Sequence, residues 1–319
     1  MDVFDQRLVK GAAGVVRWSR LDADGDAVAA QGTVTAGIVD ANGDEILAPG
    51  QATDPDAGVH SLTVPASATA ELGLWTVTFT DAGDGHTDTV LVDVCADRLV
   101  TIKHLRTLQP SLADAHRYPA SRLRDEILAA EVELEWICDR AFTRRYARET
   151  LDGTGKVNLT LRHRDIASVV SVTVDGTALT STEIAALTID GKDIRRETGW
   201  AEGYSNVVIE YIHGWTAPPQ PLVRAFALRI RLEVHQDANR IPERAERFSD
   251  DSGSYDLSTP GALDTGYPRV DGVYSRYSAR KAKTSNADTG GQGSSSGVAA
   301  VSMPIDIDPT RDSLFHRRR

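Results

Sequence analysis

The sequence predicts an α+β fold of two domains that is followed by an extended C-terminal tail. Short runs of alternating apolar and polar residues fill residues 1–97, and a second group of such runs spans residues 155–213. Helical periodicity marks residues 121–142 and 221–238, which flank the second group. We therefore expect an N-terminal β domain and, over residues 98–280, a helical domain with a β-hairpin insertion.

Residues 1–97 are expected to form an immunoglobulin-like β-sandwich. Turn signals such as Asn42-Gly43 separate the alternating runs, and about seven short strands in a segment of this length are typical of a sandwich. Trp75 lies within one run and is expected to fill the core. The clearest runs are 15–18, 33–39, 59–64, 74–80 and 88–94.

One stretch of this domain, from Asp22 to Asp26, resembles a calcium loop in its acidic spacing. Its glycine comes too early, however, and Thr33 stands where such a loop needs a bidentate glutamate. A hairpin turn is therefore the favoured interpretation, and no metal site is expected in this domain.

The net charge of −11 is concentrated in the first third of the chain. Residues 1–98 hold 16 acidic and 5 basic side chains, whereas the remainder holds 30 of each. Wrapping of DNA needs many Lys and Arg side chains, so the acidic composition suits either solubility or a surface past which DNA slides without sticking. No apolar run is long enough for a membrane span, and a signal peptide is not expected. Cys95 and Cys138 lie on different predicted elements, so we expect no disulfide and synthesis in a reducing cytoplasm.

Two helices are expected after residue 98. Thr101 can cap a short helix over residues 101–108, and Ser121 can cap the long helix over residues 121–142. The long helix has one core stripe, made of Leu123, Ile127, Ala130, Leu134, Ile137 and Ala141. Its back carries Leu128, Val132 and Trp136. An apolar patch of this kind indicates covered surface, and either the N-terminal domain or a neighbouring subunit is expected to cover it.

The helix over residues 221–238 has two apolar faces, where a surface helix needs only one. Pro218, Pro219 and Pro221 precede or open it. The first face carries Val223, Phe226, Ala227, Ile230 and Val234, and the second carries Ala225, Leu228 and Leu232. The second face has two interpretations, which are burial within its own domain and contact with a neighbouring subunit.

Between the long helices, residues 155–213 are expected to form hairpins, one of which turns at Asp175-Gly176. His213 follows the last strand and has no second histidine or cysteine at ligand spacing. We therefore interpret it as a packing residue at the end of a strand, and we expect no zinc site. Further on, residues 271–277 are expected to form a short closing element anchored by tyrosines.

These elements together resemble a known family. The residues that carry the resemblance are Tyr118-Pro119 with Ser121, Leu123, Arg124, Asp125 and Ile127, then Asp152 to Gly155, and finally Val208 to Trp215 followed by Pro221. Over residues 99–280 their order resembles that of the head-to-tail adaptor (connector) proteins of tailed bacteriophages. The resemblance implies a non-enzymatic virion protein that assembles, commonly as a dodecamer, into a ring below the portal.

The resemblance also implies partners and a location. A ring of this kind binds the portal protein, extends the DNA channel without sequence-specific contacts, and provides the platform for a stopper or tail-completion protein. It lies in the neck of the virion, after assembly in the host cytoplasm, and it takes part in genome ejection. We expect no cofactor, no metal ion and no membrane contact. Leu128, Val132, Trp136, Ala225, Leu228 and Leu232 are the expected subunit interface.

Residues 281–319 are expected to be a flexible linker and a docking tail. Val301, Met303, Ile305 and Ile307 alternate with polar residues or proline, which is typical of a strand added to the edge of a partner's sheet. Leu314 and Phe315 supply an apolar anchor, and Arg317, Arg318 and Arg319 a basic end. A frayed terminus is the alternative interpretation.

Two other function classes compete with the adaptor. A surface- or glycan-binding virion module would use exposed aromatic side chains on the N-terminal domain, where Trp18 and Trp75 are nearly the only large ones. An enzyme is the least favoured class, because neither paired carboxylates nor a nucleophile with its base can be assembled from the spacing.

Overall fold

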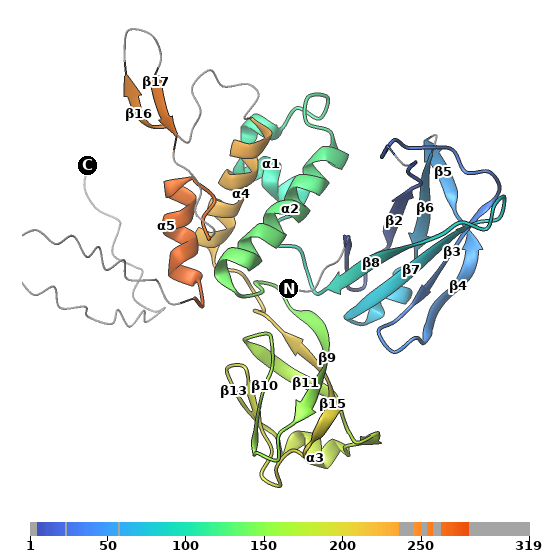
Figure 1. Ribbon diagram of the computed structural model, residues 1–319. Coiled ribbons are helices and arrows are strands. Elements are labelled where there is room, and N and C mark those ends of the chain that lie inside the picture. Colours follow the sequence, from blue (N-terminus) through green and yellow to red (C-terminus); the bar gives the residue numbers. More distant parts are fainter. Residues whose placement is uncertain are drawn as a thin grey trace, which may run out of the picture. The chain divides into compact units, whose positions relative to one another are not determined.

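The computed structural model describes residues 5–22, 24–56, 58–235, 245–249, 254–257 and 263–280. Over these residues the chain is α+β, with several antiparallel sheets and five α-helices (Figure 1). Three separate apolar clusters form the core. They gather side chains from residues 8–94, from residues 99–142 together with 222–274, and from residues 147–211.

Eight strands make up the N-terminal part of the chain. They are β1 (Gln6–Val9), β2 (Gly14–Ser19), β3 (Val34–Val39), β4 (Glu45–Gln51), β5 (Thr53–Asp56), β6 (Val59–Val64), β7 (Gly73–Asp81) and β8 (Thr87–Cys95). One sheet has the strand order β1-β8-β7-β3-β4 and the other has the order β2-β6-β5. All five of the clearest alternating runs in the sequence lie in these strands. The pairing of β1 with β8 is parallel, whereas the other pairings within these two sheets are antiparallel.

Aromatic side chains fill the space between these two sheets. Trp75 is 3% exposed, which confirms its predicted place in the core, and Trp18 is 5% exposed. The Trp18 ring stacks on Phe79 with the centroids 5.4 Å apart, and its indole N–H donates to Asp88 Oδ2 at 2.8 Å. Both tryptophans are therefore held inside the N-terminal part of the chain.

The stretch from Asp22 to Asp26 is a hairpin turn, as the sequence predicts. Leu21 and Ala27 pair across it, and Gly25 adopts a φ of +88° at its tip. Asp22 Oδ1 accepts hydrogen bonds from the backbone N–H groups of Asp24 and Asp26. This carboxylate thus closes the turn itself.

The helices are α1 (Ile102–Leu108), α2 (Ala120–Cys138), α3 (Ser181–Ala185), α4 (Gln220–Val234) and α5 (Pro268–Tyr277). The Thr101 hydroxyl accepts a hydrogen bond from the His104 N–H at 3.2 Å, so the predicted cap of α1 is present. The predicted limits of α2 were wrong at both ends. Pro119 is its N-cap and Ser121 lies inside the helix, while Asp139, with a left-handed φ of 53°, ends it after Cys138, four residues before position 142.

The core of the helical layer lies between α2, α4 and α5, with α1 beside them. The predicted stripe on α2 is buried throughout, and Leu123, Ile127, Ala130, Leu134 and Ile137 all belong to this cluster. Ala141 is also buried, but it lies beyond the end of the helix. α4 ends at Val234 with His235 as its C-cap. The last three positions of the predicted helix, 236–238, lie outside the described residues.

The β segment between α2 and α4 starts earlier than the sequence predicts. Its larger sheet has the order β12-β11-β15-β9 and a smaller one has the order β10-β14-β13. The strands are β9 (Arg145–Gly153), β10 (Asn158–Thr160), β11 (Ile166–Val174), β12 (Thr177–Ala178), β13 (Thr188–Asp190), β14 (Asp193–Arg195) and β15 (Gly203–His213). The expected start at residue 155 was therefore wrong, because β9 already pairs with the whole length of β15.

The long loop after α4 is described only in part. β16 (Ala245–Ser249) and β17 (Ser254–Leu257) pair in an antiparallel hairpin, and α5 follows (Figure 1). Tyr274 is buried in the helical core and Tyr277 packs against it, so the predicted closing element with tyrosine anchors is present. None of the helices in the described part of the chain combines the length and apolar character that a membrane crossing requires.

Candidate functional site

The back of α2 presents the predicted interface residue Trp136 to solvent. Its side chain is 50% exposed, whereas Leu128 and Val132 on the same side of the helix are half-buried. The Arg280 guanidinium lies 5.1 Å from the Trp136 ring centroid, and Arg280 Nη2 donates to the Trp136 carbonyl at 2.9 Å. The indole is thus held in one position at the surface, with an arginine on one of its faces.

On α4 the predicted interface residues have a different environment. Ala225 and Leu232 are each 6% exposed and belong to the helical core, and Leu228 is half-buried against it. The second apolar face of α4 is therefore largely covered by its own chain. Of the two interpretations of this face, burial within the domain accounts for Ala225 and Leu232.

α5 belongs to the same helical core. It packs on α4, and its Val270 and Tyr274 side chains are fully buried in the shared core. Arg229 of α4 lies over the Tyr267 ring, with its guanidinium 5.3 Å from the ring centroid, and Arg229 Nε donates to Glu133 of α2 at 2.8 Å. The prediction of a closing element did not include its position against α4.

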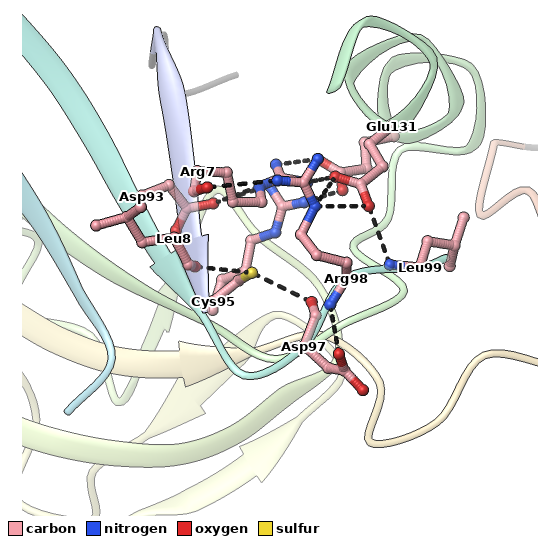
Figure 2. Close-up of polar contacts among 10 residues, drawn as sticks. Arg7, Leu8, Asp93, Cys95, Asp97, Arg98, Leu99 and Glu131 are labelled. Atoms are coloured by element: carbon pink, nitrogen blue, oxygen red, sulfur yellow. Dashed lines mark hydrogen bonds and ion pairs between the residues drawn. The ribbon is translucent and has the colours of Figure 1, made fainter. Parts of the chain in front are cut away.

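A buried cluster of charged side chains joins the N-terminal strands to α2 (Figure 2). Arg7 on β1 donates from Nε to Asp93 Oδ2 at 3.0 Å and from Nη1 to Glu131 Oε2 at 2.5 Å. Arg98 and the Leu99 backbone N–H also donate to Glu131. The side chains of Arg7 and Glu131 are 1% and 3% exposed, so this contact is shielded from water. No local pattern in the sequence indicates this contact, because Arg7 and Glu131 each stand alone among their neighbours.

The buried carboxylates and guanidinium groups of this cluster shift one another's pKa values. Burial alone would raise the pKa of Glu131, but the guanidinium groups of Arg7, Arg98 and Arg145 outweigh it and lower that pKa. Burial of Arg7 likewise opposes its charge, yet the carboxylates around it raise the pKa of its guanidinium. For Glu135, burial dominates and raises the pKa. The cluster links the N-terminal strands to α2, and each buried charge in it is stabilised by a partner of opposite sign.

A cleft of about 120 Å³ lies where the C-terminus of α2, the start of β9 and the end of β15 meet. Five arginines and three carboxylates line it, together with His163, His213 and Trp136. Arg140 pairs with Asp165 at 2.8 Å, Arg164 with Asp139 at 3.3 Å, and Arg145 with Glu135 and, at 3.5 Å, with Asp93. The lining holds two more arginines than carboxylates, and it includes several flat side-chain surfaces.

His213 packs at the end of β15, as the sequence predicts. It is 4% exposed, and its ring stacks on His163 with the centroids 4.1 Å apart. Burial, and then the neighbouring His163 and Arg145, lower the pKa of His213 well below its usual value. Among the residues that the structure describes, no group of three or more His, Cys, Asp or Glu side chains could hold a metal ion.

Two further outcomes concern residues that the sequence analysis singles out. Cys95 and Cys138 are buried free thiols, and burial raises the pKa of each to about 12. The predicted docking residues lie outside the described residues; they are Val301, Met303, Ile305, Ile307, Leu314, Phe315, Arg317, Arg318 and Arg319.

Comparison of the chain with models of known protein families and with curated proteins finds no match.

Proposed function

We propose that this chain is a structural subunit of the head-to-tail adaptor ring of a tailed bacteriophage. The observation that carries the proposal is the order of elements from α1 to α5. A hairpin-rich β segment separates two long helices, α2 and α4, which pack on each other, and a short helix closes the layer. This order supports the proposal because the resemblance to adaptor proteins rests on the same sequence of elements.

The surface of α2 supports a role as a ring subunit. Trp136 is half-exposed, with Leu128 and Val132 on the same side of the helix. An aromatic side chain held at the surface is characteristic of the centre of a protein–protein interface. In a closed ring the neighbouring subunit would cover Trp136. The contact would be heterologous, because one surface of each subunit meets a different surface of the next.

The N-terminal strands fit the role of an immunoglobulin-like appendage to the ring. They form two sheets around a core that is separate from the helical one, and most of the chain's acidic excess lies there. DNA that passes through the channel would be repelled by such a surface rather than bound to it. The C-terminal residues 301–319 are proposed to dock on the portal or on an adjacent ring of the neck.

The alternative of a glycan- or surface-binding module loses its main support. Trp18 and Trp75, its two aromatic candidates, are both buried. Over the described residues of the N-terminal strands, the exposed large apolar side chains are Val15 and Leu21. Sugar recognition commonly uses an exposed aromatic platform, so we favour the adaptor.

The test is a cryo-EM map of the neck of the particle whose genome encodes this chain. We expect a ring of this chain between portal and tail, with Trp136 covered by the next subunit. Mass spectrometry of purified particles provides an independent check, because a structural subunit must be present in several copies. Absence from the particle, or a position away from the neck, would overturn the proposal.

A further inference from the structure

Tyr204 is the most exposed of the large apolar and aromatic side chains in the described part of the chain. It is 88% exposed and stands at the start of β15, beside Glu202 and Ser205, which are also exposed. The position lies at the far end of the β segment from the helices, since β15 runs from this end to His213 next to the cleft. A tyrosine so fully exposed on a strand end contributes little to the stability of its own chain.

The backbone around Tyr204 is nevertheless fixed. Ser205 adopts a left-handed φ of 47°, which is unfavourable for a residue with a side chain. Its N–H donates to Asp152 Oδ1 at 2.6 Å, and the Asn206 side chain accepts from the Gly153 N–H at 2.8 Å. The Asn206 amide also donates to Asp175 Oδ1 at 2.9 Å. Hydrogen bonds to β9 and to the turn between β11 and β12 thus hold this strained segment in place.

The packing leaves this turn no freedom to relax. A Cβ atom at Gly153 would lie 1.7 Å from the Ala201 carbonyl oxygen, so only glycine fits beneath the loop. Backbone strain costs on the order of 1–3 kcal/mol and persists where the surrounding structure over-determines it, often at functional sites. A rigidly presented tyrosine loses little conformational entropy on binding, which suits it to anchor an interface.

The cleft at the opposite end of β15 is complementary in charge to the loop that carries Tyr204. Its arginines outnumber its carboxylates by five to three, whereas the Tyr204 loop is bordered by the carboxylates of Asp152, Asp175 and Glu202. Two guanidinium groups already lie against aromatic rings there, Arg140 over Trp215 at 5.0 Å and Arg280 over Trp136. A third aromatic ring with a hydroxyl group can stack on the same guanidinium planes.

We propose that Tyr204 and its loop, residues 202–206, insert into this cleft on an adjacent copy of the same chain. The inference rests on the proposed ring and names the contact that closes it. The 11 residues of β15 separate loop from cleft by about 35 Å, so the two surfaces cannot meet within one chain. Two different surfaces that join head to tail make a heterologous contact, the type that generates rings.

The experiment places a photo-crosslinking benzoylphenylalanine at position 204 of the full chain. Particles assembled with this variant are irradiated, and crosslinked peptides are identified by mass spectrometry. We expect crosslinks to peptides of residues 136–146 or 162–164, and the span of β15 assigns such crosslinks to two copies. The matched control carries the same probe at Val170, a 51% exposed residue of the same sheet, and gives no cleft crosslink.

A charge exchange tests the specificity of the contact. Arg164→Glu places a carboxylate in the cleft and should lower the crosslink yield about fivefold, because it then faces the acidic loop. Adding Glu202→Lys to the same chain should restore most of the yield. Circular dichroism of each variant shows whether it folds, and an unchanged yield in a folded Arg164→Glu chain would overturn the proposed charge complementarity.

The remaining outcomes separate this inference from the proposed function. One result is a ring of this chain in the neck in which position 204 crosslinks outside the cleft or not at all. That result overturns the inference and leaves the adaptor proposal standing. A chain that is absent from the neck overturns the adaptor proposal. In that case the same crosslinking of the purified chain at high concentration decides the inference, since the loop–cleft contact between copies is then either found or refuted.

Discussion

Arg7 and Glu131 are 124 positions apart in the sequence, yet an Arg7 guanidinium nitrogen lies 2.5 Å from a carboxylate oxygen of Glu131. The pair links the first strand, β1, to the middle of α2, and both side chains are almost fully buried. Asp93 on β8 completes the contact from the other side of the guanidinium. The N-terminal sheet and the helical layer are therefore joined by charges, although their apolar cores are separate.

Replacement of Arg7 is expected to destabilise the chain strongly. In Arg7→Ala, the carboxylates of Glu131 and Asp93 stay buried and lose their principal counter-charge, which typically costs about 3–5 kcal/mol. Urea unfolding followed by circular dichroism measures the free energy of unfolding. The matched control is Lys10→Ala, since Lys10 pairs with Glu71 at 3.1 Å in an exposed position.

The control should cost no more than about 1 kcal/mol, because exposed ion pairs contribute little. Equal losses in the two variants would mean that burial does not strengthen the contact between Arg7 and Glu131. A loss in Arg7→Ala confined to the N-terminal sheet, with the helical signal unchanged at all urea concentrations, would show that the two parts unfold independently.

His213 is expected to make the stability depend on pH below neutrality. Its folded pKa is lowered, so below the unfolded pKa of about 6.5 the unfolded chain binds a proton that the folded chain does not. Stability is therefore full above about pH 6.5 and falls as the pH decreases. Between pH 7.5 and pH 5.5 the loss from this residue should be about 1 kcal/mol.

Comparison of the wild type with His213→Phe isolates this contribution, since the variant keeps an aromatic ring against His163 but does not titrate. Urea unfolding at both pH values gives the difference. His116→Phe, at an exposed position, is the control for the replacement of a histidine by phenylalanine. The same pH dependence in the wild type and in His213→Phe would contradict the assignment.

Gly214 is expected to tolerate no side chain. Its φ is +92°, and a Cβ atom there would lie 2.3 Å from the Thr143 carbonyl oxygen. Gly214→Ala should lower the free energy of unfolding by more than about 2 kcal/mol, from backbone strain and overpacking together. Gly43→Ala, with a φ of +89° and nothing within 4 Å, should show the strain alone, about 1 kcal/mol. Thermal unfolding of both variants measures the difference, and equal values would show that the Thr143 contact relaxes freely.

Trp136 is expected to matter for assembly rather than for folding. Trp136→Ala removes a half-exposed ring and its contact with Arg280, which should cost about 1 kcal/mol of stability or less. Incorporation of the chain into particles, measured by quantitative mass spectrometry, should decrease at least fivefold, because a buried interfacial tryptophan often contributes about 2 kcal/mol or more. Val15→Ala, at a 46% exposed position on β2, is the control and should be incorporated normally.

The sequence was informative where one periodic pattern determined burial. The stripe from Leu123 to Ile137 is buried because its spacing places every member on one side of α2, and the Thr101 cap follows from the hydroxyl beside a helix start. The strand β9 was missed because its buried residues include Arg145, which looks like a surface residue until Asp93 and Glu135 are seen around it.

Features of the candidate site that depend on contacts between distant residues could not be predicted from the sequence. Nothing local in residues 6–9 indicates that they form a strand, since β1 exists only through its parallel pairing with β8. The cover of α4 by α5 was also hidden, because α5 contains Gly272 and only a few apolar residues. The rigid loop at Tyr204 depends on Asp152 from β9 and on Asp175 from the turn between β11 and β12, and no spacing in the sequence brings these residues together.

The parallel pairing of β1 with β8 has a consequence for the order of folding during synthesis. Gln6 pairs with Val92, so the first strand of the chain must wait until more than 80 further residues have left the ribosome. Arg7 waits longer still, because its second partner, Glu131, follows later on α2. Long-range pairings of this kind slow folding and leave an open sheet edge in the meantime. A nascent chain that stalls before residue 131 would therefore expose both an unpaired strand and an unpaired guanidinium. Binding of a chaperone should prevent most aggregation during this stage of synthesis.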